Sequence, residues 1–328
     1  MLMHVALNGW QFNAVSPSCS CLCSSCLQRP RTVLPSIDRS VVCKTQCLSH
    51  SAVGLQVAMP HSLTPSVAAS ADLSSVLALD NIRQTLIRQE DTIIFLLIER
   101  AQFARNSPVY EADAVPVPAF DSSGKRYSLL EYLLLETEQI HGKIRRYTSP
   151  DEQAFYPDHV PQLVLPSIQY EQVLAPCAET INLNNLIMDL YLQELVPGIT
   201  EPGDDNNYGS AAMQDVLCLQ ALSKRIHYGK FVAEAKFRAD PEQYQKLISN
   251  RDQDAIMQTL TSIDVEKKVV ERVRRKAAIF GQDITDSDDG QASSFKVEPS
   301  TVAQLYEKWI MPLTKQVQVA YLLRRLDS

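Results

Sequence analysis

Several features that would place this chain in a common class are missing from it. No run of about 18 apolar residues occurs, so the sequence predicts no membrane-spanning helix. Acidic residues outnumber basic ones, 38 to 31, which removes the positive field that favours nucleic acid or an anionic membrane surface. Any anionic ligand therefore needs a local site made by a few cations.

Cysteine is scarce in most of the chain. Six of the eight cysteines lie in the first 50 residues, and only Cys177 and Cys218 follow them. Two cysteines in so long a segment do not form a disulfide framework. The early cysteines include a C-x-C-x-C-x-x-C run from Cys19 to Cys26, and thiolates of this kind can bind zinc. A zinc site is therefore one hypothesis for the N-terminal segment.

The N-terminal segment has a second interpretation. Residues 1–71 show no helical or strand periodicity, are rich in Ser and small apolar residues, and contain one acid, Asp38, against four Arg or Lys. This composition is typical of an organelle transit peptide. We therefore expect a disordered targeting segment at 1–71 and a folded body at 72–328. The zinc hypothesis requires that the cysteines remain in the mature protein.

Alternation with period two is also rare, and helical periodicity dominates the body of the chain. Apolar residues recur at helical spacing from Ile82 to Ile98, and Ser128 with Glu131 forms a capping box that begins a helix ending near Arg146. Further helices are expected up to Pro197, over 222–237, over 241–280 with a break near Arg251, and from a box at Thr301 and Gln304 to the C-terminus. The predicted class is all-α, in a single helical domain.

Catalytic motifs are missing from this body. It contains no nucleophile beside a base, no H-E-x-x-H and no glycine-rich phosphate loop. The histidines are scattered, and His227 is predicted to pack or cap rather than to catalyse. What remains is a set of polar residues at the spacing of helical neighbours.

Two cations stand out in the stretch LSKRIHYGKFVAEAKF, residues 222–237. Read as one helix, it places Arg225 and Lys236 about 20° apart around the axis and about three turns apart along it. Two further pairs have i,i+4 spacing, Ser262 with Glu266 and Thr314 with Gln318. Taken singly, such residues more often form solvated helix faces. Together they predict a helical protein that binds an anion.

Three long stretches resemble one known family. LDNIRQTLIRQEDTIIFLLIERAQF, RIHYGKFVAEAKF and PLTKQVQVAYLLRRL are similar, and in the same order, to the all-helical chorismate mutases of fungi and plants. The resemblance covers essentially all of residues 73–328. It implies the all-α chorismate mutase fold, a homodimer, and a reaction that needs neither a cofactor nor a metal.

The resemblance also implies which residues bind chorismate. The implied catalytic residues are Arg83, Arg225, Lys236, Glu266, Thr314 and Gln318, with Ser262, where the fungal pattern has Asn, as a weaker substrate contact. The two arginines are expected on the two carboxylates, Lys236 beside the ether oxygen, and Glu266 on the ring hydroxyl. The rearrangement to prephenate is pericyclic and moves no proton, which explains why no nucleophile was found.

A second set of residues matches the amino-acid effector site of the family. The set comprises Arg145, Arg146, Asn206, Asn207, Gly209 and Ser210. The resemblance implies a site at the dimer interface, tryptophan as activator, tyrosine or phenylalanine as inhibitor, and a location in the chloroplast stroma. Without the resemblance, Y-G-S at 208–210 predicts only a helix N-terminus.

One alternative from a different functional class is open at this point. A catalytically silent helical regulator could keep the same fold and bind an amino acid or a partner enzyme. Such a protein has no need to keep six pocket groups, and turnover of chorismate distinguishes the two hypotheses.

Overall fold

The computed structural model describes residues 77–119, 124–168, 172–282 and 294–327. Within these ranges the chain is helical and has no β-strand, only an isolated antiparallel bridge between Gln282 and Phe295. The all-α prediction is therefore confirmed. The predicted transit peptide and the early cysteines lie outside the described residues, and no helix inside them combines the length and apolar character needed to cross a membrane.

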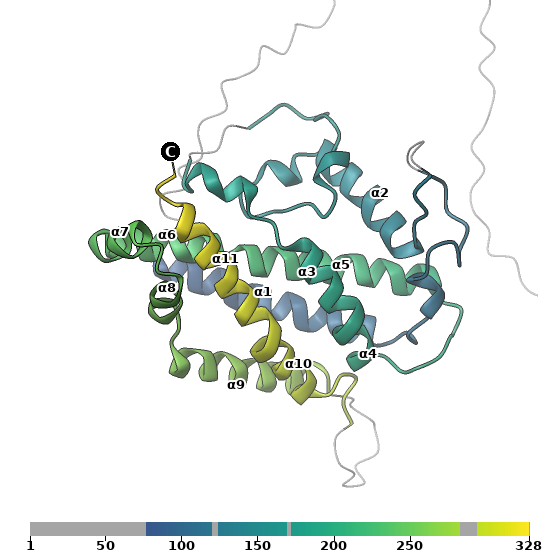
Figure 1. Cartoon of the computed structure of the whole chain (residues 1–328). Coiled ribbons are helices and arrows are strands. Elements are labelled where there is room, and N and C mark those ends of the chain that lie inside the picture. Colours follow the sequence, from purple (N-terminus) through teal and green to yellow (C-terminus); the bar gives the residue numbers. More distant parts are fainter. Residues whose placement is uncertain (1–76, 120–123, 169–171, 283–293, 328) are drawn as a thin grey trace, which may run out of the picture. The chain divides into compact units, whose positions relative to one another are not determined.

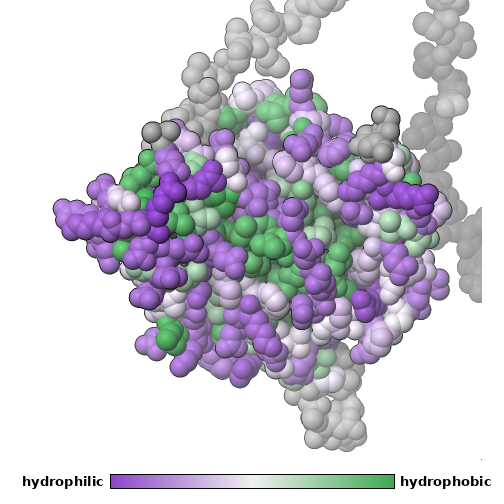
Figure 2. All heavy atoms as spheres, viewed as in Figure 1, coloured by the Kyte–Doolittle hydropathy of each residue, from purple (hydrophilic) through white to green (hydrophobic). Residues whose placement is uncertain are grey.

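The described α-helices are joined by connections of very different length, the longest between α1 and α2 and between α2 and α3 (Figure 1). They are α1 (Leu79–Arg100), α2 (Leu129–Lys143), α3 (Asn184–Leu190), α4 (Val196–Ile199), α5 (Tyr208–His227), α6 (Gly229–Ala239), α7 (Pro241–Ser249), α8 (Gln253–Leu260), α9 (Ile263–Phe280), α10 (Pro299–Leu305) and α11 (Met311–Arg324). Helix α5 packs against α1, α2, α3, α6 and α11, so it is the helix around which the others are arranged. Figure 2 shows apolar side chains gathered between α3 and α11 on the viewed face, whereas hydrophilic ones cover α7.

The start of α2 follows the predicted chemistry. The Ser128 hydroxyl accepts a hydrogen bond from Glu131 N–H at 3.2 Å, and the Glu131 carboxylate accepts one from Ser128 N–H at 2.9 Å. This capping box is the one read from the sequence. The helix ends at Lys143, three residues before the predicted end, because Arg145 adopts a left-handed φ of 75°.

Two prolines lie inside helical segments rather than at their ends. Pro197 follows a π-helical turn, Tyr191–Leu195, and Pro312 follows a second one, Tyr306–Ile310. Proline lacks an N–H and its ring clashes with the carbonyl four residues earlier in a regular α-helix, and a π turn accommodates one extra residue there. The prediction of a helix that stops at Pro197 was therefore wrong, because the helix continues to Ile199.

Other helix boundaries also differ from the predictions. Residues 222–237 form two helices that meet at Tyr228, where Phe231 N–H bonds the Tyr228 carbonyl, a three-residue span. The break near Arg251 is confirmed, with φ of 51°, but a second break before α9 was missed. The last segment begins at Pro299 and not at the predicted Thr301 box, because a proline at the first position already starts a helix.

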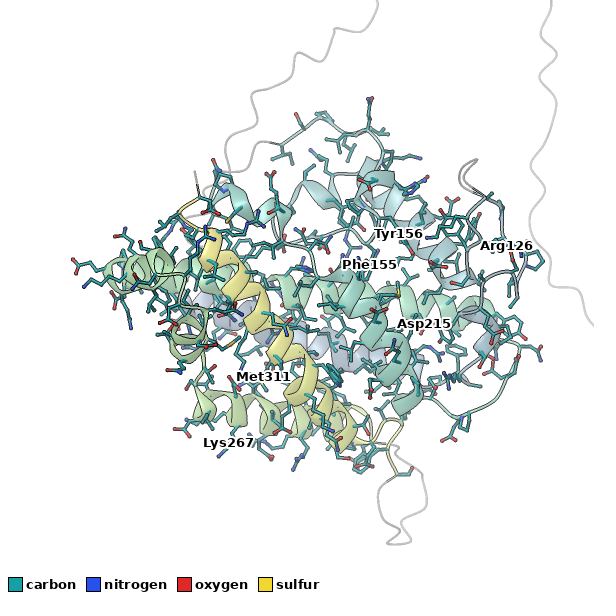
Figure 3. The ribbon with its side chains drawn as sticks, in the orientation of Figure 1. Arg126, Phe155, Tyr156, Asp215, Lys267 and Met311 are labelled. Carbon is teal, nitrogen blue, oxygen red and sulfur yellow. The ribbon has the colours of Figure 1, made fainter. Side chains whose placement is uncertain are left out.

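A buried ionic network joins α1 to α5. The Arg100 guanidinium and the Asp215 carboxylate are completely buried and lie 2.5 Å apart. Asp215, labelled in Figure 3, also accepts hydrogen bonds from Tyr191 and Tyr110 at 2.7 and 2.9 Å. Burial raises the pKa of Asp215, and the arginine and the two hydroxyls oppose that rise. The network fixes the two longest helices of the core against each other.

This network yields a stability prediction. Asp215→Ala leaves the Arg100 charge buried without its partner, and breaking a buried pair in this way costs about 3–5 kcal/mol of the free energy of unfolding. Urea unfolding followed by circular dichroism measures this value. The matched control is Glu271→Ala, which breaks exposed pairs with Arg274 and Arg275 and should change stability by less than about 0.5 kcal/mol. Equal effects for the two variants contradict the assigned role of Asp215.

Candidate active site

Arg225, in the last turn of α5, is a buried cation without an ion-pair partner among the described residues. The residue is 5% exposed, its Nη1 donates to Thr314 Oγ1 at 3.3 Å, and its Nε has no hydrogen-bond partner within the described ranges. The Thr314 hydroxyl donates to the Ile310 carbonyl at 2.6 Å, so its oxygen is free to accept from Arg225. Burial lowers the pKa of the guanidinium. An anionic ligand would supply the negative charge that the buried guanidinium lacks.

The carboxylate whose charge acts on Arg225, that of Glu90, is already paired with other cations. Glu90 of α1 is 1% exposed and accepts two hydrogen bonds from Arg272 of α9, at 2.6 and 2.9 Å. Lys276 adds a third contact at 3.3 Å. Glu90 and the Tyr306 hydroxyl still favour the charged form of Arg225 and so oppose the fall in its pKa. The charge of Arg225 is thus supported at a distance but is not matched by direct contact.

Lys236 lies on α6, one helix after Arg225. Its ammonium donates to the Leu260 carbonyl at 3.2 Å, and burial lowers its pKa while the charge of Glu266 opposes that shift. Glu266 lies in the first turn of α9 and accepts a hydrogen bond from Lys315 at 3.0 Å. Ser262 is the residue before α9, is exposed, and makes no capping hydrogen bond with its side chain.

A glycine allows these helices to approach α11 closely. A Cβ atom on Gly229 would lie 2.7 Å from the Thr314 carbonyl oxygen and 3.4 Å from Gln318 Cγ, so any larger residue would push α11 away. Thr314 and Gln318 are both buried, one turn apart, and the Gln318 Oε1 has no hydrogen-bond partner in the described part of the chain. The structure therefore brings Arg225, Thr314 and Gln318 to one place.

Glu234 makes a second contact between α6 and α11, in addition to the close approach of Gly229 to Thr314. Its carboxylate is fully buried and accepts from Tyr321 at 2.6 Å and from Arg325 at 2.6 and 3.1 Å. The Tyr321 hydroxyl in turn accepts from Ala175 N–H at 2.9 Å. Because Lys236 lies two residues after Glu234, this anchor also fixes the segment of α6 that carries Lys236 relative to α11.

Arg83 lies apart from the buried cluster. It is on the first turns of α1, its side chain is 66% exposed, and its Nη1 bonds Asp80 at 2.7 Å. The structure gives it no contact with Arg225 or Lys236. Its predicted role at the second carboxylate therefore stays a prediction.

The predicted effector residues form two groups that lie apart from each other within one chain. Arg146 bonds Gln220 of α5 at 2.7 Å, and Arg145 bonds the Pro166 carbonyl at 2.8 Å. The other group, Asn206, Asn207, Gly209 and Ser210, is exposed at the N-terminus of α5. Ten residues separate Ser210 from Gln220, which corresponds to about 15 Å along the helix.

Sequence reasoning missed several residues of the cluster. Lys315, which donates a hydrogen bond to Glu266, follows Thr314 directly in the sequence. From the sequence alone, a place on an exposed helix face was an equally good prediction for it. Tyr306 and Glu90 carry no sequence signal of their own, because only the fold brings them near Arg225. The prediction for His227 is confirmed: its Nε2 accepts from Leu183 N–H at 2.8 Å, so it fixes the backbone.

Comparisons with known proteins give one consistent result. A family model described as chorismate mutase type II matches residues 207–319. Chloroplastic chorismate mutase 3 of Arabidopsis thaliana is 52% identical over 258 residues, which cover 78% of this chain and 80% of that protein. The solved structure of Candida albicans Aro7p chorismate mutase in complex with L-Trp has a TM-score of 0.71 at 45% identity, covering 77% of this chain and 93% of that one. A structure of AtCM1 with tyrosine in its allosteric site has a TM-score of 0.69 at 49% identity, with coverage of 78% and 99%.

Proposed function

This chain belongs to the chorismate mutases of plants and fungi, and we propose that the buried cluster around Arg225 is the site where it rearranges chorismate to prephenate. One observation supports this site above all others, the burial of the Arg225 guanidinium without a carboxylate partner among the described residues. A buried cation is costly unless it is paired. Chorismate carries two carboxylates, and one of them can pair with Arg225 by charge-assisted hydrogen bonds.

We assign the second carboxylate to Arg83. Its present partner, Asp80, is 89% exposed, and a surface ion pair of this kind contributes only about 0–1 kcal/mol. Exchanging Asp80 for a substrate carboxylate therefore costs little. The two arginines would hold the substrate from opposite ends and favour the compact conformer that the reaction needs.

The chemistry requires donors at the ether oxygen, because that oxygen gains negative charge as its bond to the ring breaks. Lys236 supplies a charged donor that the Leu260 carbonyl positions, and the negative charge of Glu266 favours its protonated form. Gln318 supplies an amide on α11, opposite Gly229. Donors fixed in advance around a developing charge stabilise the transition state more than the ground state.

The ring hydroxyl is assigned to Glu266. The carboxylate of Glu266 is oriented by Lys315, and it can accept a hydrogen bond from a hydroxyl while keeping that contact. Ser262 is exposed one turn earlier and belongs at most to the rim of the site. Prephenate formation from chorismate by the purified protein tests the whole assignment, and a folded protein without turnover would leave only a binding or regulatory role.

Regulation by aromatic amino acids is proposed to need two subunits. Exposed apolar side chains lie at the end of α2, at Ile140 and the following Ile144, and on α5, at Met213 and Leu217. A second copy would cover this surface. A homodimer that pairs these helices can bring Arg145 and Arg146 of one subunit to the Asn206–Ser210 segment of the other. We propose that tryptophan activates and that tyrosine or phenylalanine inhibits at this site.

Location in the chloroplast stroma is proposed for the mature protein. Chloroplastic chorismate mutases are among the similar proteins, and residues 1–71 have the composition of a transit peptide. The enzyme body is then residues 72–328. Mass spectrometry of the mature N-terminus tests this division and also decides whether the early cysteines remain available to bind zinc.

The first kinetic prediction concerns Lys236. Because its charge acts on an oxygen that becomes negative only during the reaction, Lys236→Ala should lower kcat by roughly 10²- to 10³-fold. The fold should be unchanged, since the ammonium has one backbone partner, the Leu260 carbonyl, among the described contacts. Steady-state kinetics measure kcat, with Lys268→Ala, an exposed lysine on α9, as the control. A folded Lys236→Ala protein with normal kcat removes Lys236 from the mechanism.

The second prediction concerns Gln318. An amide donates at every pH, whereas a carboxyl group donates only while protonated. Gln318 is 6% exposed, so burial should raise the pKa of a carboxyl placed there. For Gln318→Glu, kcat should be retained at acidic pH and fall as the pH rises through that pKa.

The parent should keep its activity above neutral pH and lose it only when Lys236 deprotonates. The pKa of Lys236 is lowered, so this loss comes at a lower pH than for a free lysine. Measuring kcat against pH for both proteins gives the comparison. Superimposable curves refute the role of Gln318.

The third prediction concerns Gly209. A Cβ atom at this position meets nothing within 4 Å in one chain, so Gly209→Ala should neither strain the fold nor change activity without effector. It should weaken the response to tryptophan, because the added methyl group enters the proposed effector site. Gly198→Ala, whose Cβ makes an ordinary 3.8 Å contact, is the matched control. A normal tryptophan response in Gly209→Ala shows that the assignment of this segment is wrong.

A further inference from the structure

Two oppositely charged residues of the proposed active site influence each other but form no ion pair. The charge of Glu266 opposes the fall in the pKa of Lys236. Each residue is bonded to a different partner, however: the Lys236 ammonium donates to the Leu260 carbonyl at 3.2 Å, and the Glu266 carboxylate accepts from Lys315 at 3.0 Å. Among the described residues, Lys315 is the one ion-pair partner of Glu266.

A direct pair between Lys236 and Glu266 would be harmful to the reaction as proposed. Lys236 is partly buried, and opposite charges attract more strongly where water is partly excluded. A carboxylate bonded to the ammonium would neutralise the charge that is needed at the ether oxygen. It would also turn Glu266 away from the ring hydroxyl of chorismate. The site therefore requires Glu266 to stay near Lys236 without binding it.

Lys315 is placed to compete for the Glu266 carboxylate. It lies on α11 directly after Thr314, and its side chain is 19% exposed. Because a close approach to Gly229 fixes Thr314 against α6, the backbone of Lys315 cannot move independently of that helix. Lys315 makes no other ion pair with a described residue, so its bond to Glu266 ties α11 to the first turn of α9.

The same arrangement occurs at the buried cation of the site. Glu90 supports the charge of Arg225 without contacting it, and its carboxylate is bonded to Arg272 and Lys276 of α9. In both places a cation on a neighbouring helix binds the carboxylate that could otherwise pair with a substrate-binding cation. This second occurrence makes a chance surface bond a poor explanation of the pair on α11.

We propose that Lys315 is a positioning residue of the reaction: it holds the Glu266 carboxylate away from Lys236 and so leaves the ammonium free for the ether oxygen of chorismate. Lys315 itself touches no reacting atom. This inference rests on the proposed function, because it takes Lys236 and Glu266 as substrate contacts. It predicts that removal of Lys315 damages catalysis through Glu266 and Lys236, and not through the fold.

The charges around Lys236 determine how the loss of Lys315 would appear in a pH profile. Glu266 is the one described group whose charge opposes the fall in the pKa of Lys236. Because a bound anion stabilises a protonated amine, direct pairing with Glu266 would raise that pKa further. The loss of activity at alkaline pH would then move to higher pH. Helix α6 packs against α1, α5, α7 and α11, whose other charged side chains in the site are Arg83 and Arg225, while Glu234 of α6 is bonded to Arg325, and Glu242 and Lys246 of α7 are exposed.

The test measures kcat and KM against pH for the parent, Lys315→Met, Lys315→Arg and the control Lys308→Met. In Lys315→Met, kcat should fall by about tenfold or more, because the ether oxygen loses an unpaired donor. The loss of activity at alkaline pH should move up by about one pH unit or more, because Lys236 gains a bound anion. Lys315→Arg can still bind Glu266 and should restore both values toward those of the parent. Lys308, whose one hydrogen bond to a described residue is to Gln304, should be replaceable without effect.

A second series separates an effect through Glu266 from the loss of the Lys315 charge itself. Lys315→Met is repeated in Glu266→Gln, whose amide can still accept from the ring hydroxyl but carries no charge to bind Lys236. The shift of the pH profile should then be absent. A shift of equal size in both backgrounds overturns the proposal. A higher KM with no shift in the pH profile also overturns it, because Lys315 would then only orient Glu266.

An NMR titration of the free protein makes the test independent of catalysis. The carbon signal of Lys236 Cε, assigned with Lys236→Arg, gives the pKa of the ammonium without substrate. That pKa should be higher in Lys315→Met than in the parent, and an unchanged pKa overturns the role of Lys315. A raised pKa with an unchanged kcat supports the exchange of ion pairs but overturns the proposed role of Lys236, so the two failures are distinguishable.

Discussion

The arrangement of the core depends on keeping one guanidinium, that of Arg225, buried and charged without a carboxylate beside it. Burial lowers its pKa, so the fold must supply other support for the charge. Thr314 accepts one hydrogen bond from Arg225. Glu90 of α1 stabilises the charge of Arg225 without direct contact, because its carboxylate is bonded to Arg272 and Lys276 of α9. A direct salt bridge to Glu90 would satisfy Arg225 and leave nothing for a substrate to bind.

This constraint explains why the contacts between helices are so specific. Gly229 lets the start of α6 touch α11 at Thr314, and Glu234 ties α6 to Tyr321 and Arg325 further along the same helix. Two tie points fix both the distance and the rotation of α11 relative to α6. Donors on the two helices can then converge on one small anion. A looser pair of helices would lose the preorganisation on which a reaction without proton transfer depends.

Much of this could be read from the sequence, and the exceptions have physical causes. Helical periodicity and the Ser128 capping box predicted local structure correctly because both depend on residues a few positions apart. The π turns before Pro197 and Pro312 were not predictable, because a proline more often ends a helix than follows a bulge. The pairing of Glu90 with Arg272 was equally hidden, since 182 residues separate the two. The family motifs predicted the site residues, but only the fold brings Lys315 to Glu266 and Tyr306 to Arg225.

The proposed effector and substrate sites share one rigid element. Helix α5 begins at Tyr208, next to the exposed Gly209 and Ser210, and contains Arg225 in its last turn. These 17 residues span about 26 Å. A continuous hydrogen-bonded helix can carry a displacement over this distance, whereas a loop would not do so reliably. The middle of α5 is fixed by Asp215, which is bonded to Arg100, so a sliding motion of α5 would break a buried ion pair. A small rotation about that point preserves the pair and moves both ends. Coupling between the two sites is therefore more compatible with a tilt of α5, together with α1, than with a displacement of α5 along its axis.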